Sequence, residues 1–75
     1  MSFDPPATSE SLTARARKHL PDADFVYVYE AETQAPWKLV VRKGNGHPYV
    51  QHCHEQDLFL ACKMAATRLE IGVHP

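Results

Sequence analysis

The stretch that decides the fold is EQDLFLACKMAATRLEIG, residues 55–72. Its apolar side chains recur three and four positions apart, which is the spacing of one face of an α-helix. That face carries Leu58, Ala61, Cys62, Ala65 and Leu69, widened by Phe59 and Ala66. Acidic residues suit the first turn of a helix and basic residues the last, and a glycine such as Gly72 can take the left-handed conformation that ends helices. The stretch therefore predicts a helix over residues 55–71.

A second row of apolar residues lies on the opposite side of this predicted helix. At about 100° per residue, Leu60, Met64 and Ile71 fall roughly opposite the core face, where a surface helix is normally polar. One interpretation is three scattered exposed side chains, which are common on protein surfaces. The other is a stripe that contacts a partner or a second copy of the chain, forming a homodimer.

Length and composition limit the chain to one small domain. The chain has 75 residues, of which 44% are hydrophobic and 23% charged, with a formal net charge of −1. This balance is typical of a globular domain and argues against a strongly basic nucleic-acid binder. Residues 1–8 are predicted to be a flexible lead and residues 9–75 a single α+β domain. A core of this size is marginal and often relies on a partner.

The N-terminal residues do not resemble a secretory signal, because they are polar and contain Pro5 and Pro6. No apolar run in the sequence is long enough to span a bilayer. These features predict a cytoplasmic protein without a membrane segment. The two cysteines, Cys53 and Cys62, are then expected to be reduced.

The first half of the chain predicts a helix followed by a strand. A helix is expected over residues 9–19, capped by the hydroxyl of Thr8 or Ser9 or beginning earlier at Asp4. It ends before Pro21, because the residue that precedes a proline is disfavoured in helical geometry. Residues 25–29, FVYVY, are β-branched or aromatic throughout and predict a strand.

Two further strands complete the predicted sheet. They span residues 37–43 and 48–54 and are joined by Gly44-Asn45-Gly46, a sequence typical of hairpin connections. Sequential strands with short connections favour an antiparallel meander with both helices on one face. The predicted fold class is α+β, in the order helix, three antiparallel strands, long helix.

The alternation along these strands predicts one covered and one open sheet face. If Val26, Val28, Leu39 and Val41 face the helices, the open face carries Phe25, Tyr27 and Tyr29 beside Lys38 and Arg42. A shift of one residue in register would exchange the two faces.

Histidines and cysteines near residue 53 raise the question of a metal site. His52 and His54 share one strand face and Cys53 the other, so two ligands are available where zinc needs at least three from the protein. Neighbouring Cys and His side chains on a strand also point apart, which argues against a nucleophile and base pair. We expect no metal, no cofactor and no catalytic residue.

Nucleic-acid binding is one functional alternative, since aromatic and basic side chains on an open sheet stack bases and contact phosphates. The order of elements resembles the double-stranded RNA-binding domain over about two-thirds of the chain. That family carries a basic run at the start of its last helix, where this chain has Glu55-Gln56-Asp57.

Binding to another protein is the function that the sequence favours. Tyr27, Tyr29 and Trp37 are residue types that anchor interfaces, although strand propensity alone would also place them there. Acidic residues flank the first predicted strand, and they suit contact with a basic surface or a solvated edge that opposes aggregation; they are Asp22, Asp24, Glu30 and Glu32.

At the level of class, a single small domain without catalytic residues and with several contact surfaces resembles the phage-encoded anti-CRISPR inhibitors, which share no common motif. The resemblance implies a non-catalytic inhibitor that binds a CRISPR effector complex and blocks access to target DNA. It also implies that the four acidic residues contact the lysines and arginines with which the effector binds DNA.

Overall fold

A computed structural model describes residues 6–75 of the chain. The elements are α1 (Ser9–His19), β1 (Phe25–Glu30), β2 (Trp37–Arg42), β3 (Tyr49–Cys53), η1 (Glu55–Asp57) and α2 (Leu58–Leu69). The predicted α+β class and the order helix, three strands, helix are confirmed. The predicted flexible lead lies mostly outside the described residues. Of its last three residues, Ala7 packs against the core and Thr8 caps α1.

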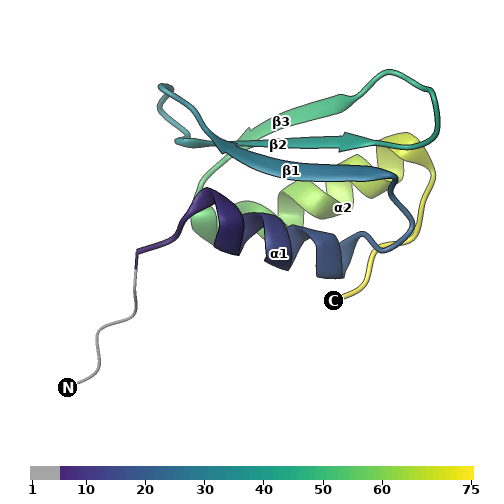
Figure 1. Ribbon diagram of the computed structural model, residues 1–75, viewed down its shortest axis with the longest axis horizontal. Helices are drawn as coiled ribbons and strands as arrows, with labels where there is room; N and C mark the ends of the chain where they lie inside the picture. The colour runs from purple at the N-terminus through teal and green to yellow at the C-terminus, as the bar shows by residue number, and fades with distance from the viewer. Residues whose placement is uncertain (1–5) are drawn as a thin grey trace.

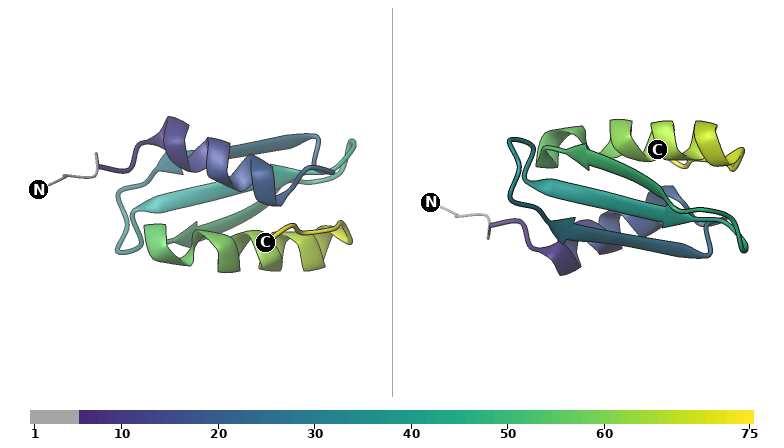
Figure 2. Two further views of the ribbon diagram at one scale, coloured as in Figure 1. Left: turned by 90° about the horizontal axis from the view of Figure 1, so that it is seen from below. Right: turned by 90° about the horizontal axis from the view of Figure 1, so that it is seen from above.

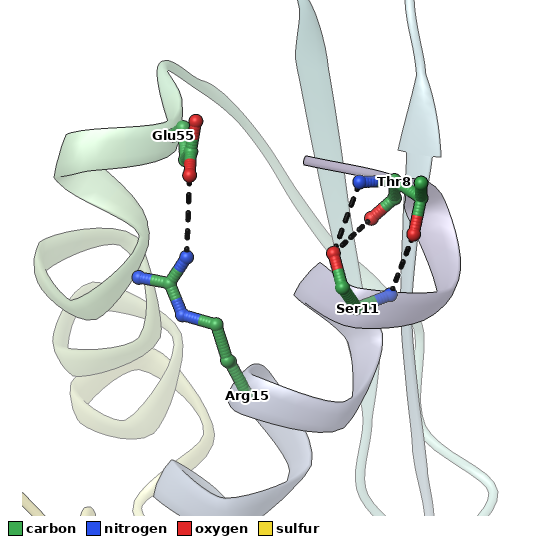
Figure 3. A network of polar contacts seen from close by, with 4 residues as sticks. All are labelled: Thr8, Ser11, Arg15 and Glu55. Carbon is green, nitrogen blue, oxygen red and sulfur yellow. Dashed lines mark hydrogen bonds and ion pairs between the residues drawn. The ribbon is translucent and has the colours of Figure 1, made fainter. Parts of the chain in front are cut away.

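The start of α1 is fixed by reciprocal hydrogen bonds between Thr8 and Ser11 (Figure 3). The Ser11 amide donates to Thr8 Oγ1 at 3.0 Å, and the Thr8 amide donates to Ser11 Oγ at 3.0 Å. Two amides that have no partner within the helix are thereby satisfied. The helix ends at its C-cap, Leu20, directly before Pro21, as predicted.

The three strands form an antiparallel meander in the order β1-β2-β3. Both helices lie side by side on one face of the sheet, and no element of residues 6–75 covers the other face (Figures 1 and 2). Val28 pairs with Leu39, and Leu39 pairs with Gln51. The connection between β2 and β3 covers residues 43–48 and turns at Gly44, whose φ of +59° suits a residue without a Cβ.

The core lies between the sheet and the two helices. Each helix presents small and branched side chains to the strands. The buried apolar residues are Leu12, Ala16 and Leu20 from the first helical region, Val26, Val28, Trp37, Leu39, Val41 and Cys53 from the sheet, and Leu58, Ala61, Cys62, Ala65 and Ala66 from α2. Four of the five predicted core positions of α2 are therefore fully buried, and Leu69 is half-buried.

Side chains of α1 cover the outer edge of β1. The Val28 amide donates to Thr13 Oγ1 at 2.9 Å, and Ser9 Oγ donates to the Val28 carbonyl. Arg17 Nε donates to the Val26 carbonyl at 3.2 Å. Three of the backbone groups that β1 turns away from β2 are thus paired, and the side chains of α1 shield this edge from a further strand.

The last helix differs from its prediction at both ends. Residues 55–57 form a 3₁₀ turn, and the α-helix begins at Leu58 and ends at Leu69. The prediction that Gly72 supplies the left-handed residue is wrong, because Glu70 takes that conformation with φ 56° and ψ 45°. The chain therefore leaves the helix two residues earlier than the glycine suggests.

Polar contacts also join the parts of the helical layer. Arg15 of α1 reaches Glu55 of η1, with 3.6 Å between Nη1 and Oε1 (Figure 3). After α2 the chain turns back toward the end of α1, where the His74 amide donates to the His19 carbonyl at 2.8 Å. The C-terminal segment thereby satisfies a carbonyl at the end of α1 that has no partner in the helix.

Candidate binding surfaces

The uncovered sheet face is set by the strand register. Residues that alternate with the buried valines and leucines point away from the helices, and cross-strand pairs place them in rows. The open face carries Phe25, Tyr27 and Tyr29 from β1, Lys38, Val40 and Arg42 from β2, and Val50 and His52 from β3. The conditional prediction that Phe25, Tyr27 and Tyr29 share this face with Lys38 and Arg42 therefore holds.

Two tyrosines and a lysine form a packed group on that face. The ring centroids of Tyr27 and Tyr29 lie 4.5 Å apart, and the rings are inclined by 36°. Lys38 Nζ stands 5.4 Å from the centre of the Tyr29 ring, within cation–π range. Tyr29 is 39% exposed. The group thus offers aromatic area whose side chains already hold one another in place.

Trp37 does not join the tyrosines. It shares its sheet face with Leu39 and Val41, and it is only 8% exposed because it packs in the core. Of the three aromatic residues predicted to anchor a partner, only Tyr27 and Tyr29 lie on the open face.

The four predicted acidic contacts divide into two pairs at opposite ends of β1. Asp22 and Asp24 precede the strand, and Glu30 and Glu32 stand at and after its end. All four are exposed. A strand of six residues at about 3.3 Å each separates the pairs by about 20 Å. They do not form one acidic patch.

Asp24 already has partners inside the domain. Its carboxylate accepts a hydrogen bond from the Gly44 amide and lies 3.9 Å from Lys43 Nζ. It therefore fixes the β2–β3 turn against the start of β1. Arg42 supports the same turn by donating to the Gly44 carbonyl.

A groove runs between β3 and α2, with a volume of ≈ 580 Å³. Tyr49 and Gln51 form its sheet side. The helix side is formed by Leu60, Lys63, Met64, Thr67 and Arg68. A second hollow of ≈ 240 Å³ continues along β3 toward Asp57 and shares Gln51, Leu60 and Met64 with the first.

Two of the three residues of the predicted apolar stripe, Leu60 and Met64, lie in this groove. Leu60 is 55% exposed and Met64 is 44% exposed, and both line the groove. Ile71 lies beyond the end of α2 and is half-buried against the core. The row therefore ends at Met64, and whether it joins two copies of the chain stays a prediction.

Both cysteines are free thiols buried in the core. Burial, with Cys53 nearby, raises the pKa of Cys62 to about 12. Burial, and then the Asp57 carboxylate, raises the pKa of Cys53 above its ordinary value. Both thiols are protonated at neutral pH, so they are poor nucleophiles and poor metal ligands.

The two histidines considered as metal ligands line the smaller hollow together with Cys53. His52 is exposed on the open face and His54 is exposed at the start of η1. Within residues 6–75, no group of three or more His, Cys, Asp or Glu side chains is arranged to hold a metal ion.

Sequence reasoning missed the groove as a site. Tyr49 and Gln51 are ordinary strand residues, and Lys63 and Arg68 are ordinary charges of an exposed helix surface. The only local signal was the exposed pair Leu60 and Met64. Their relation to β3 depends on how α2 packs across the sheet, which no spacing in the chain reveals.

Among the described residues, none of the helices is long and apolar enough to cross a membrane. No protein-family model matches this chain, and comparison with curated proteins and with solved structures gave no significant match.

Proposed function

We propose that this domain binds another protein through its open sheet face and carries out no chemistry of its own. The observation that carries the proposal is the packed group of Tyr27, Tyr29 and Lys38 on a face that no helix covers. Tyrosine is a frequent energetic centre of protein interfaces, because it buries a large rigid area and keeps a polar group. We place its activity in the cytoplasm, where free thiols such as Cys53 and Cys62 stay reduced.

The arrangement lowers the entropic cost of binding. A side chain immobilised on association costs about 0.5–1.5 kcal/mol. Tyr27 and Tyr29 already restrict each other at 4.5 Å, and Lys38 lies over the second ring. A partner that covers this face therefore gains contact area on side chains that are partly ordered beforehand.

The test is a pull-down from a nuclease-treated bacterial lysate with the tagged domain as bait. We expect a stoichiometric protein, and we expect its recovery to fall when Tyr27 and Tyr29 are both replaced by alanine. Phe59→Ala is the matched control, because Phe59 is a similarly exposed aromatic residue at 37% that lies on α2. Recovery that survives the double tyrosine change but not the control would remove the open face from the proposal.

The resemblance to anti-CRISPR inhibitors supplies a specific partner for this proposal, a CRISPR effector complex. The domain would then block target DNA, with Asp22, Glu30 and Glu32 meeting the basic residues that bind DNA. The direct measurement is target-DNA binding by purified effector complexes with increasing amounts of the domain. An unchanged DNA affinity across effector types at saturating domain would reject this partner while leaving protein binding in place.

Nucleic-acid binding is the second candidate, and one observation favours it. The open face combines three aromatic residues with Lys38, Arg42 and His52, and none of its strand residues is acidic. Stacking on aromatic rings beside cations suits single-stranded nucleic acid. Such binding releases cations held by the phosphates, and because this release is less favourable at high salt, the affinity falls steeply as salt is added. The affinity of an interface with an apolar centre falls less. Titration of single-stranded DNA and RNA at two salt concentrations separates the candidates.

A further inference from the structure

The free edge of the sheet is β3. The opposite edge, β1, is closed by Ser9, Thr13 and Arg17 of α1. In antiparallel pairing the backbone groups of alternate residues point to opposite sides. The backbone groups of Val26 and Val28 point away from β2, so those of their partners Val41 and Leu39 point toward β3. Val41 and Leu39 pair with Tyr49 and Gln51. The backbone groups of Val50 and His52 therefore point away from β2.

These outward groups are largely unused. Among the hydrogen bonds of residues 6–75, only the Gln51 side-chain amide reaches this edge, donating to the His52 carbonyl at 3.1 Å. The Val50 amide, the Val50 carbonyl and the His52 amide are left to solvent. An edge of this kind is a template for one more strand.

The groove described above follows the same edge. Its two hollows of ≈ 580 and ≈ 240 Å³ share Gln51, Leu60 and Met64, so one depression runs along the whole of β3. Its floor is apolar at Leu60 and Met64. A chain paired with β3 would direct every second side chain toward the helical layer and hence into this groove.

Charge in the groove is unequally distributed. Lys63 and Arg68 line the larger hollow, and no acidic residue lines it. Neither cation forms an ion pair within the described part of the chain. The acidic lining residue, Asp57, belongs to the smaller hollow at the far end of β3. An occupant with a carboxylate at the Tyr49 end therefore complements the site.

The arrangement of α2 argues against a second copy pairing with β3. Figure 2 shows α2 projecting past β3 at the margin of the sheet. In a symmetric pair, two β3 strands about 4.8 Å apart would bring both projecting helices into the same space. A single extended segment without a helix beneath it meets no such obstacle.

We propose that an extended segment of another protein adds to β3 as a fourth strand, inserts an aliphatic side chain between Tyr49, Leu60 and Met64, and places a carboxylate beside Lys63 and Arg68. This site is separate from the open sheet face and stands or falls independently of it.

The direction of the added segment follows from the position of Arg68 relative to β3. The strand β3 runs from Tyr49 toward η1, and α2 returns alongside it, so Arg68 stands near the Tyr49 end. Antiparallel addition, the slightly more stable pairing, puts the C-terminal part of the segment at that end. The recognised sequence therefore has its aliphatic residue first and its acidic residue, or a free C-terminal carboxylate, after it.

The test is selection of random twelve-residue peptides displayed on phage against the full chain, followed by affinity measurement of the selected peptides as synthetic probes. We expect enrichment of an aliphatic residue followed by acidic ones. Leu60→Glu should weaken these probes at least about tenfold, since it fills the groove with a charge of the wrong sign. Ala14→Glu, which adds the same charge on the exposed side of α1, is the matched control and should change affinity less than about twofold.

Charge reversal tests the carboxylate. We expect Lys63→Glu with Arg68→Glu to weaken the acidic probes about tenfold or more at low salt. Selection against this double variant should instead enrich basic residues at the same position. Unchanged enrichment of acidic residues would overturn the assignment of the carboxylate to these cations.

Strand addition is tested at Val50. Its amide points away from β2, so Val50→Pro keeps the hydrogen bonds within the sheet and removes one that the peptide needs. We expect about a tenfold loss with Val50→Pro and little loss with Val50→Thr, in proteins whose circular dichroism matches the wild type.

Three results would overturn the proposal. These are selections without enrichment, probes that bind equally to Leu60→Glu and Val50→Pro, and a chain whose sedimentation mass is that of a dimer until Leu60 is replaced. The last result would assign the groove to a second copy.

Discussion

Thr13 links the first helix to the sheet through one buried hydroxyl. The residue is only 4% exposed, and its Oγ1 accepts from the Val28 amide at 2.9 Å. We expect Thr13→Val, which keeps the shape and removes the acceptor, to lower the free energy of unfolding by about 1–3 kcal/mol, because a buried amide is left unpaired. Urea denaturation measures this. Thr13→Ser keeps the hydroxyl and should cost less; equal losses for the two variants would mean that packing of the methyl group, not the hydrogen bond, is what matters.

Cys62 predicts a loss of stability in alkali. Burial raises the pKa of this thiol from 9.0 to about 12. Above pH about 9 the unfolded chain releases the proton and the folded chain keeps it, so the free energy of unfolding falls by about 1.4 kcal/mol per pH unit until pH nears 12. Below pH about 9 this contribution does not vary.

The variant Cys62→Ala removes this thiol and leaves the other ionisable groups of the chain in place, so comparison with the wild type reports on Cys62. We expect the variant to be less stable than the wild type at pH about 8, since it leaves a small cavity, and the gap to close as the pH rises. Chemical denaturation at a series of pH values provides both curves. Parallel curves would show that the thiol ionises as readily in the folded chain as in the unfolded one.

Single residues also show the limit of reading faces from sequence. Trp37 alternates in phase with Leu39 and Val41, and the burial of that face takes Trp37 out of the aromatic surface. Tyr27 and Tyr29 follow the same alternation to the open face. Which face meets the helices depends on contacts between distant parts of the chain, so strand propensity alone leaves the outcome open.

At the scale of the element, the end of α2 carries a strained residue. Glu70 holds φ 56°, a conformation that costs non-glycine residues roughly 1–2 kcal/mol. We expect Glu70→Gly to raise the free energy of unfolding by about 0.5–1 kcal/mol, even after the added flexibility of the unfolded chain is counted. Thermal unfolding compares the variants.

Gly72→Ala is the control for this prediction. Gly72 does not have a positive φ, and a methyl group there would meet only Asp22 Oδ2 at 3.4 Å, an ordinary contact. We expect no loss of stability. A destabilisation by Gly72→Ala larger than the gain from Glu70→Gly would show that the glycine, and not Glu70, controls the end of the helix.

The elements themselves are largely predictable, because their signals are local. The helical spacing of Leu58 to Ala65, the β-branched run of β1 and the hydroxyl cap at Thr8 each lie within a few residues. Sequence spacing predicts the helix end two residues too late, because Gly72 is the better left-handed residue by propensity. Ile71 turns into the core after Glu70, and this tertiary contact overrides the preference.

The groove illustrates what local signals omit. Leu60 and Met64 were recognisable as exposed apolar residues of a helix. Their counterparts Tyr49 and Gln51 come from a strand that meets α2 only after the chain has turned through η1. A site shared by two elements becomes visible once their packing is known, and neither half marks it alone.

At the scale of the whole molecule, the predicted acidic contacts form two separate pairs rather than one patch. The pairs before and after β1 are about 20 Å apart, which is beyond the screening length of about 8 Å at physiological salt. Each pair therefore meets a different part of any basic partner. Asp24 is engaged with Lys43 and the Gly44 amide, so changing it would disturb the turn as well as the charge.

We therefore predict separate and additive effects on association with the partner recovered by the pull-down. Asp22→Lys alone, and Glu30→Lys with Glu32→Lys, should each slow association several-fold, and the triple variant should slow it by about the product, because distant charges couple weakly. Dissociation should change less, since exposed charges act mainly on encounter. Stopped-flow or surface plasmon resonance at low and high salt resolves the two rates. Association rates that are equal for wild type and triple variant at low salt would remove the acidic residues from the interface.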